Sequence, residues 1–463
     1  MLKEFKKEIA NNDISNIDIN EEVAVISIIG RHNYALEKAI EGLRKNSIWL
    51  YLINNTINGE HISLVISNKY LKKAVNVVHN QVFGAIKKLN VVALGKGTVG
   101  KAFINQVLES KEQIRIRKNV DIRIVAVVDS IHVLFNPIGI KHDWETRLKK
   151  SKQTNDIPAL LELLENNHLE NLVIIDNTAS EEIVHFYPTF AKKGLDIIAS
   201  NKIANTIDLE YYKELRSILK HKSKQFLYET NVGAGLPLLD TLKQLHHSGD
   251  HIKKIRGIFS GSLSYIFNKF STQDLPFSTI LKEAIEKGFT EPDPRIDLSG
   301  KDVARKLLIL ARELDYEKEL TDVSIESLIP KSFSNKWTVK EFLTHEKELN
   351  AYYGDIKKSL TADEVLRYVG ELDAEGNLEV KLVKASKQSP LGNLSGADSI
   401  FEIFTETYGD RPMVIQGAGA GAAPDAGGGA SPTPGICWAG VAGTAVFSST
   451  LPALGAAVRR LPK

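Results

Sequence analysis

A short stretch near residue 300 concentrates charged side chains that suit the binding and protonation of a small polar molecule. It contains Glu291, Asp297, Asp302 and Lys306. Residues 300–314 are rich in Val, Leu and Ala, which predicts a largely buried helix with Asp302 and Lys306 on one face. Charges on such a helix need a partner or a ligand. The set suits a substrate with an ammonium and a carboxylate group, and a structural ion pair is the alternative.

The segment that leads into this helix contains two prolines. A residue before proline is pushed toward extended geometry, so residues 291–295 are predicted to be non-helical. Ser299 is then the expected N-cap of the helix.

A second candidate site is a glycine-rich turn between an apolar strand and a helix that places Val99, Phe103 and Val107 on one face. Glycine permits the tight turn, the approach of a pyrophosphate and close packing of helix on strand, while the helix N-terminus attracts phosphate. The context therefore predicts a dinucleotide site, with a ligand-free turn as the alternative. The turn consists of Gly95, Lys96, Gly97, Thr98, Val99 and Gly100.

The next predicted strand ends at Asp129. A carboxylate at this place hydrogen-bonds the ribose 2′-hydroxyl of NAD, whereas a nearby arginine suits the 2′-phosphate of NADP. The residues directly after Asp129 include no arginine or lysine, which favours NAD. An ordinary aspartate at a strand end is the alternative.

Four further candidates follow strands that are predicted to be parallel. They are Thr178, Ala179, Ser180 and Lys202. Ligands bind outside the carboxyl ends of such strands, so we expect these residues near the nicotinamide or ribose of a cofactor. Lys202 can transfer a proton there. The alternatives are helix capping by Thr178 or Ser180 and a solvated charge at Lys202.

The elements that position these residues predict an α/β fold. Strands alternate with helices in the pattern of a Rossmann-type nucleotide domain over residues 85–205, and the strands are expected at 89–94, 122–128, 172–176 and 195–199. The pattern then becomes mixed, which indicates an α+β substrate and dimerisation domain over 206–400. Its elements include strands near 226–229 and 253–259 and helices near 277–287 and 300–314.

Residues 1–84 predict a separate small α+β module without a catalytic constellation. Its expected order is strand, helix, strand, strand, helix, with an Asn-Gly turn between the last two strands. Such a module is either a packing domain or a regulatory domain that binds a small molecule.

Composition limits the function classes. The chain has 463 residues, a formal net charge of +2 and a single cysteine, Cys437. The near-zero net charge does not indicate a basic surface that binds nucleic acid. No apolar run is long enough for a transmembrane helix. One cysteine cannot form an intramolecular disulfide, which favours a reducing, cytoplasmic setting.

Together these segments resemble homoserine dehydrogenase over roughly residues 86–421. Besides the glycine turn and Asn201-Lys202, the resemblance rests on three longer runs. They are Glu229 to Pro237, Phe259 to Ile266, and Thr290 to Lys306. Residues 1–84 resemble the second ACT-type regulatory module of bifunctional aspartokinase–homoserine dehydrogenases, whose kinase domain has no counterpart here.

The resemblance implies interconversion of L-homoserine and L-aspartate 4-semialdehyde with NAD or NADP in threonine and methionine biosynthesis. It implies that Lys202 and Lys306 are catalytic and that Glu291, Asp297 and Asp302 hold the substrate. It also implies a homodimer or higher homo-oligomer, and a monovalent cation, usually sodium. The implied cation ligands are Glu229 and the carbonyls of Val232, Ala234 and Leu236.

Two departures from the family pattern concern the cofactor and the C-terminus. Many members use NADP, which Asp129 does not favour. Residues 401–421 are expected to return to the nucleotide domain, where the family continues with a helix. Here residues 418–463 contain 12 Ala, 9 Gly and 5 Pro, so a disordered tail is predicted over 422–463. This switch favours a reading-frame change or a fused end.

Two competing functions remain at this stage. A dehydrogenase for a related semialdehyde commonly uses a cysteine nucleophile, and no cysteine lies near the predicted site. A truncated, inactive relative that senses an amino acid or acts as a scaffold is the other.

Overall fold

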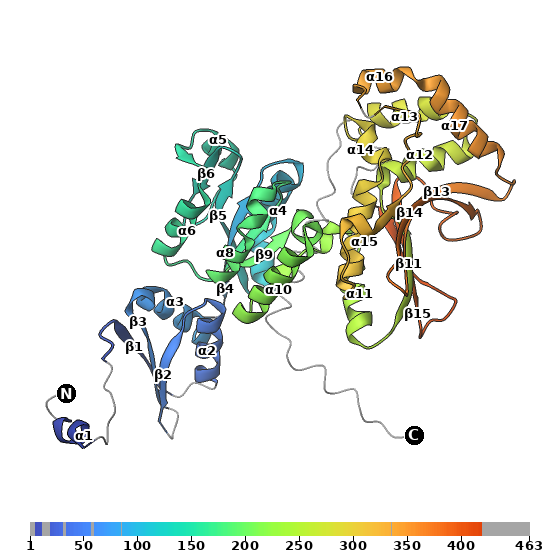
Figure 1. The fold of residues 1–463 in the computed structure, drawn as a ribbon. Coiled ribbons are helices and arrows are strands. Elements are labelled where there is room, and N and C mark those ends of the chain that lie inside the picture. Colours follow the sequence, from blue (N-terminus) through green and yellow to red (C-terminus); the bar gives the residue numbers. More distant parts are fainter. Residues whose placement is uncertain are drawn as a thin grey trace.

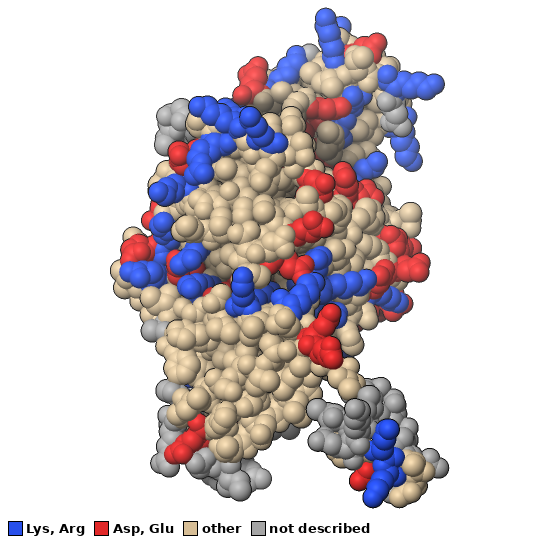
Figure 2. Space-filling model, turned by 90° about the vertical axis from the view of Figure 1, so that its left-hand side faces the viewer, with Lys and Arg blue, Asp and Glu red and all other residues tan. Residues whose placement is uncertain are grey.

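The computed structural model describes residues 5–11, 19–30, 34–56, 60–84, 86–334 and 336–418. Within these ranges the chain forms three units in sequence order, each with its own sheet (Figure 1). The predicted tail, 422–463, lies outside the described residues. No helix in the described ranges combines the length and apolar character needed to cross a bilayer. Basic and acidic side chains lie beside one another across the middle of the face in Figure 2.

The first unit is an antiparallel sheet of order β1-β3-β2, with α2 and α3 packed on one of its faces. Alternate residues of β3, including Leu64 and Ile66, are buried against these helices, while Val25 and Ile29 of β1 are exposed. The predicted order of elements is confirmed. The elements are α1 (Lys6–Ala10), β1 (Val23–Ile29), α2 (Ala35–Lys45), β2 (Leu50–Asn55), β3 (His61–Ser67), η1 (Asn68–Tyr70) and α3 (Leu71–Val82).

The second unit contains the predicted parallel sheet, which is confirmed. The strand order is β10-β9-β8-β4-β5-β6-β7, and the pairs from β10 to β5 are parallel. Val91 and Ala93 of β4 pack with α4 and α5 on one face, and Val92 and Leu94 pack with α6, α7, α8 and α10 on the other. Strands apolar on both faces are expected where helices cover both sides.

The elements of this unit are β4 (Lys87–Leu94), α4 (Thr98–Lys118), β5 (Val120–Val128), β6 (His132–Phe135), α5 (Trp144–Lys149), β7 (Gln153–Thr154), α6 (Ile157–Asn166), β8 (Leu172–Asp176), α7 (Glu181–His185), α8 (Tyr187–Lys192), β9 (Asp196–Ala199), α9 (Ile203–Thr206), α10 (Leu209–Lys222) and β10 (Phe226–Leu227).

Three details of this unit differ from the sequence predictions. Strand β10 pairs with β9, so the nucleotide unit extends to residue 227 and not only to 205. The antiparallel strands β6 and β7 extend the sheet beyond β5 and were not predicted. Val99 is 41% exposed, so it does not share the buried face of Phe103 and Val107, because it lies in the first turn of α4 beside the loop.

The third unit is a six-stranded mixed sheet of order β12-β14-β13-β11-β15-β16, and α12 and α15 pack against it. The elements are η2 (Glu229–Asn231), α11 (Leu238–His247), β11 (Ile252–Ile258), α12 (Gly261–Thr272), α13 (Phe277–Glu286), α14 (Pro294–Leu298), α15 (Lys301–Glu313), η3 (Leu320–Asp322), β12 (Val323–Ile325), α16 (Val339–Thr344), α17 (Glu346–Lys358), β13 (Glu364–Asp373), β14 (Leu378–Ser386), β15 (Asp398–Thr405) and β16 (Met413–Ala418).

Two predictions for the third unit are wrong. Residues 398–418 form β15 and β16 of this sheet and do not return to the nucleotide unit, because β15 pairs with the central strand β11. Residues 291–295 are not wholly extended, because α14 begins at Pro294. Proline is tolerated at the first position of a helix because an N–H group there would have no acceptor within the helix.

The start of α15 also differs from the prediction. Its N-cap is Gly300, in the left-handed region with φ 72°, and not Ser299. A Cβ atom at Gly300 would lie 2.1 Å from the hydroxyl of Tyr368, so both the backbone and the space require glycine.

One apolar core runs without interruption from the nucleotide sheet into the third unit. It includes Ala204 of α9 and Leu215 of α10 together with Leu307 and Leu310 of α15. The helix that carries Asp302 is therefore packed directly on the nucleotide unit.

Candidate active site

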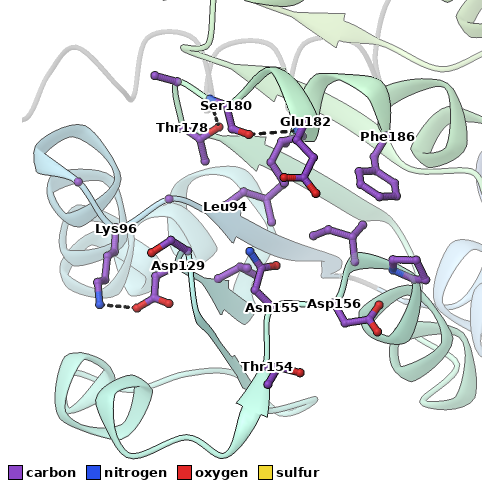
Figure 3. A pocket seen from close by; sticks show the side chains of 18 residues that line it. Leu94, Lys96, Asp129, Thr154, Asn155, Asp156, Thr178, Ser180, Glu182 and Phe186 are labelled. Atoms are coloured by element: carbon purple, nitrogen blue, oxygen red, sulfur yellow. Dashed lines mark hydrogen bonds and ion pairs between the residues drawn. The ribbon is translucent and has the colours of Figure 1, made fainter.

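A cavity of about 850 Å³ lies at the carboxyl ends of the parallel strands (Figure 3). Seven of the predicted cofactor residues line it, namely Gly95, Lys96, Gly97, Asp129, Thr178, Ala179 and Ser180. Four other predicted cofactor residues do not belong to its lining, namely Thr98, Val99, Gly100 and Lys202.

The three glycines of the turn have different surroundings. Gly95 has φ 89°, which favours glycine, and a Cβ there would lie 2.9 Å from the carbonyl oxygen of Asn177. A Cβ at Gly100 would lie 2.0 Å from the carbonyl oxygen of Gly95, so α4 can pack on the strand only with glycine. Gly97 has no heavy atom within 4 Å of its Cβ position. This open side is where a pyrophosphate can approach the backbone.

Asp129 has a basic neighbour, contrary to the sequence interpretation. Its Oδ2 pairs with Nζ of Lys96, and its Oδ1 accepts the N–H groups of Ile131, at 2.8 Å, and His132, at 2.6 Å. Burial raises the pKa of Asp129, but the Lys96 and backbone hydrogen bonds outweigh it and lower that pKa to about 2. Lys96 precedes Asp129 by 33 residues, so the residues that directly follow Asp129 do not reveal this partner.

A buried carboxylate, Asp176, fixes the two turns at the centre of the sheet edge. It accepts hydrogen bonds from the Tyr187 hydroxyl at 2.6 Å, the Thr178 N–H at 2.8 Å and the Asn201 amide at 3.1 Å. Burial raises its pKa despite these bonds. Ser180 is the N-cap of α7, so its capping interpretation is confirmed, and it still lines the cavity.

The opposite wall of the cavity was missed by the sequence analysis. It is formed by Thr154, Asn155 and Asp156, between β7 and α6. Asp156 caps α6 by accepting the N–H of Ala159 at 3.0 Å, and Pro158 lies in the first turn. An Asp followed two residues later by Pro is a helix-start signal, and it was available in the sequence.

Lys202 and Lys306 meet on one carboxylate across the boundary between the second and third units. Nζ of Lys202 lies 3.3 Å from Oδ1 of Asp302, and Nζ of Lys306 lies 2.8 Å from its Oδ2. Lys306 also donates to the carbonyl of Phe259 at 2.7 Å. Burial raises the pKa of Asp302, but the charges of Lys306 and Lys202 lower it well below its usual value. Asp302 therefore stays ionised between two amines.

A buried arginine joins the helix of this cluster to the nucleotide unit. The Arg312 side chain is 1% exposed, and its Nη1 donates to the carbonyls of Asn205, at 3.1 Å, and Ile207, at 2.7 Å. It also binds the carbonyl of Lys318 and the Glu319 carboxylate, each at 3.0 Å. These bonds fix α15 beside the segment that begins at Lys202.

Asp297 is bound to the loop that holds Lys306. Its Oδ1 accepts the Ser262 hydroxyl at 2.6 Å, and its Oδ2 accepts the Glu291 N–H at 3.0 Å. Residues 259–262 thus contact both Asp297 and Lys306, a role that the sequence analysis did not assign. Glu291 joins the group through its backbone, and its own side chain is exposed.

Glu229 is the first residue of η2, and its side chain contacts the first turn of α11, apart from the lysine cluster in sequence. Its two carboxylate oxygens accept the N–H groups of Leu239 and Asp240, each at 2.9 Å. Burial and the charge of Asp240 raise the pKa of Glu229 to about 7. The following turn contains Gly233 and Ala234, both with positive φ.

Comparison with known proteins identifies the family. Residues 95–229 match the homoserine dehydrogenase NAD-binding domain, and residues 237–430 match the homoserine dehydrogenase family model. Homoserine dehydrogenase of Saccharomyces cerevisiae is 39% identical over 353 residues, which cover 74% of this chain and 96% of the yeast protein. The chain belongs to the homoserine dehydrogenase family.

The bifunctional aspartokinase/homoserine dehydrogenase of Buchnera aphidicola is 37% identical over 426 residues, or 90% of this chain. The chain covers 52% of that protein, so it spans about half the length of this relative. A hyperthermophilic archaeal homoserine dehydrogenase, solved in complex with NADPH, has a TM-score of 0.55 at 23% identity, covering 78% of this chain and 96% of that chain. At this identity the likeness shows the fold.

The two regions matched to homoserine dehydrogenase meet at the lysine cluster. Lys202 lies in the NAD-binding region, and Asp302 and Lys306 lie in the other region. The cluster therefore forms only where the two parts of the homoserine dehydrogenase fold are in contact.

Proposed function

We propose that this chain interconverts L-homoserine and L-aspartate 4-semialdehyde with NAD or NADP. The observation that supports this most strongly is the meeting of Lys202 and Lys306 on Asp302, across the boundary between the nucleotide unit and the third unit. Bound NAD(P) supplies the acceptor or donor of the hydride. The chain itself must bind the amino acid and move the proton of its hydroxyl group.

The proposed proton transfer uses the two lysines. Oxidation of the alcohol releases a proton from oxygen, and reduction of the aldehyde requires one at the same atom. Lys306 is held by Asp302 and by the carbonyl of Phe259, so its amine is fixed for this transfer. Lys202 is bound to the other oxygen of Asp302 and approaches from the nucleotide unit.

The proposed substrate ligands are Glu291, Asp297 and Asp302, whose carboxylates suit the substrate ammonium group. Asp297 is oriented by Ser262 and by the Glu291 N–H. Glu291 is exposed at the edge of this group.

The proposed cofactor site is the first cavity together with the N-terminal turn of α4. The Gly95–Gly100 turn would hold the pyrophosphate, and Thr178 to Ser180 would lie toward the nicotinamide. We propose a preference for NAD, because the charge of Asp129 repels a 2′-phosphate and Lys96 is already engaged with it.

We propose that a monovalent cation, sodium, binds in the turn after Glu229. Partial burial and the charge of Asp240 raise the pKa of the half-buried Glu229 carboxylate, and a bound cation would relieve the repulsion between the two acids. The proposed ligands are the Glu229 carboxylate and the carbonyls of Val232, Ala234 and Leu236. Oxygen ligands suit such a hard ion.

Three further properties are proposed by similarity. The third unit forms a homodimer or a higher homo-oligomer, residues 1–84 act as an ACT-like regulatory module, and the protein is cytoplasmic. Sedimentation of the purified chain measures the first property directly.

The decisive experiment is homoserine-dependent reduction of NAD or NADP by the full purified chain. We expect turnover with homoserine, and none with a short alcohol that lacks the ammonium and carboxylate groups. Folded protein that binds the cofactor but shows no turnover would contradict the proposal and favour a sensing or scaffold role.

A further inference from the structure

A second cavity, of about 500 Å³, lies between the first unit and the nucleotide unit, away from the proposed active site. On one side it is lined by Asn46 and Ser47, which follow α2, and by Lys69 and Lys73 of η1 and α3. On the other side it is lined by residues of α6 and α8 and the segments that follow them.

Polar bonds hold the two units together around this cavity. The buried Asn46 side chain accepts the N–H of Asn171 at 2.7 Å and donates to the Asn171 side chain at 3.2 Å. Asn80 donates to the Glu170 carboxylate, and Lys224 donates to the carbonyl of Lys45. The walls of the cavity are therefore fixed relative to one another.

Two lysines of this cavity, the exposed Lys192 and the half-buried Lys73, have no carboxylate at ion-pair distance in the described part of the chain. Lys69 and Lys193 both pair with Glu165, at 2.8 and 3.3 Å. Nζ of Lys73 contacts only a carbonyl oxygen, that of Asn46, at 3.5 Å. Burial and the charge of Lys224 lower the pKa of Lys73 to about 8. The carboxylates of Glu165 and Glu170 act on Lys73 only through their charge at longer range, and a half-buried ammonium without a direct ion pair gains from an added anion.

A second unsatisfied group lies in the same wall. Oγ of Ser47 is buried and has no hydrogen-bond partner within the described residues. The floor of the cavity is apolar, and it is formed by Leu161, Leu164, Leu169, Leu172 and Leu195. An anion with an apolar part matches this lining better than inorganic phosphate, which would leave the leucines without contact.

We propose that this junction cavity binds a small organic carboxylate. Its carboxylate group pairs with Lys73 and accepts a hydrogen bond from Ser47, and its short apolar chain packs on the leucines.

The position of α6 links this cavity to the proposed cofactor cavity. The first residues of α6, Ile157 and Pro158, line the cofactor cavity, and residues from Leu161 to Asn166 line the junction cavity. The helix is only about 15 Å long. The proposal extends to coupling through α6: occupation of the junction cavity changes cofactor affinity, and the cofactor then changes carboxylate affinity by the same factor. This link depends on the proposed function, whereas carboxylate binding does not.

The first test is calorimetric titration of the full chain with 3-methylbutanoate at pH 7. We expect saturable binding that Lys73→Gln weakens at least ~10-fold, the scale of one charge-assisted hydrogen bond. Lys72→Gln, its exposed neighbour on α3, is the matched control and keeps wild-type affinity. Ser47→Ala, which leaves the charge in place, weakens binding by a smaller factor.

Absence of saturable binding, or equal binding by the Lys73 and Lys72 variants, would overturn the proposal. Binding of inorganic phosphate in place of 3-methylbutanoate would overturn the choice of a carboxylate. The link through α6 is tested by the dissociation constant of NADH, measured by its fluorescence with and without saturating 3-methylbutanoate. A shift of at least ~3-fold that is lost in Lys73→Gln supports the link, and an unchanged constant refutes it.

Discussion

Replacement of Lys306 by methionine separates a proton-transfer role from a structural one. The Lys306 side chain is 16% exposed, so most of its aliphatic part is packed against α15 and its surroundings. Methionine keeps a chain of similar volume and removes only the ammonium group. Asp302 retains Lys202 as a partner after the change.

The two roles predict different losses of kcat and of folding stability. Loss of a positioned acid–base group lowers kcat at least ~100-fold, which corresponds to about 2.7 kcal/mol of transition-state stabilisation. The structural loss is smaller, because Asp302 is 45% exposed and solvent screens the pair. The carbonyl of Phe259 loses one donor as well. Together these effects cost about 1–2 kcal/mol of folding stability, a fall of roughly 1–2 °C in Tm for a chain of this size.

The assay is kcat at saturating homoserine and cofactor, with Tm and cofactor affinity measured on the same preparations. Lys301→Met is the control, because it makes the same substitution at an exposed position on the same helix. We expect the control to keep kcat within about twofold, the spread usual for surface changes. A folded Lys306→Met protein with near-normal kcat would refute the proton-transfer role and leave a structural ion pair.

Three further substitutions test other parts of the structure. Asp129→Ser removes a charge that repels a 2′-phosphate and releases Lys96, so the kcat/KM ratio of NADP to NAD rises at least ~10-fold; an unchanged ratio would contradict this. Folding raises the pKa of Glu229 from 4.5 to about 7, so the folded state holds an extra proton in that window and loses stability as pH rises through it. Tm measured from pH 5 to 8 therefore falls less in Glu229→Gln than in the wild type, and sodium at pH 8 raises only the wild-type Tm; identical pH profiles would argue against this. Arg312→Met leaves three carbonyls and a carboxylate without their donor, so urea unfolding is expected to show a loss on the order of 3 kcal/mol. A loss below about 1 kcal/mol would show that these bonds contribute little.

Strands of the nucleotide unit could be predicted because each carries a local signal. β4, β5, β8 and β9 are predominantly apolar, and each lies within two residues of its predicted range. β6 and β7 have four and two residues, too short for any periodic signal. β10 was predicted as a strand but assigned to the wrong unit. The strand with which it pairs, β9, lies well before it in the sequence, and no local pattern indicates that pairing.

The candidate site shows the same division between local and long-range information. The spacing of Asp302 and Lys306 predicted their shared helix face, which the 2.8 Å ion pair confirms. The pairing of Lys96 with Asp129 joins two loops at adjacent strand ends, and no local pattern reveals it. The cap at Gly300 was missed because serine is a common N-cap, whereas here the hydroxyl of Tyr368 occupies the space of a side chain.

The unbroken core between the nucleotide unit and the third unit has a consequence for turnover. Separating the two units would expose the contacts between α9, α10 and α15, so substrate cannot enter by a hinged opening at low energetic cost. The lysine cluster is reached from solvent as it stands, since the Lys202 and Asp302 side chains are 33% and 45% exposed. The proposed substrate can therefore reach this cluster without separation of the two units.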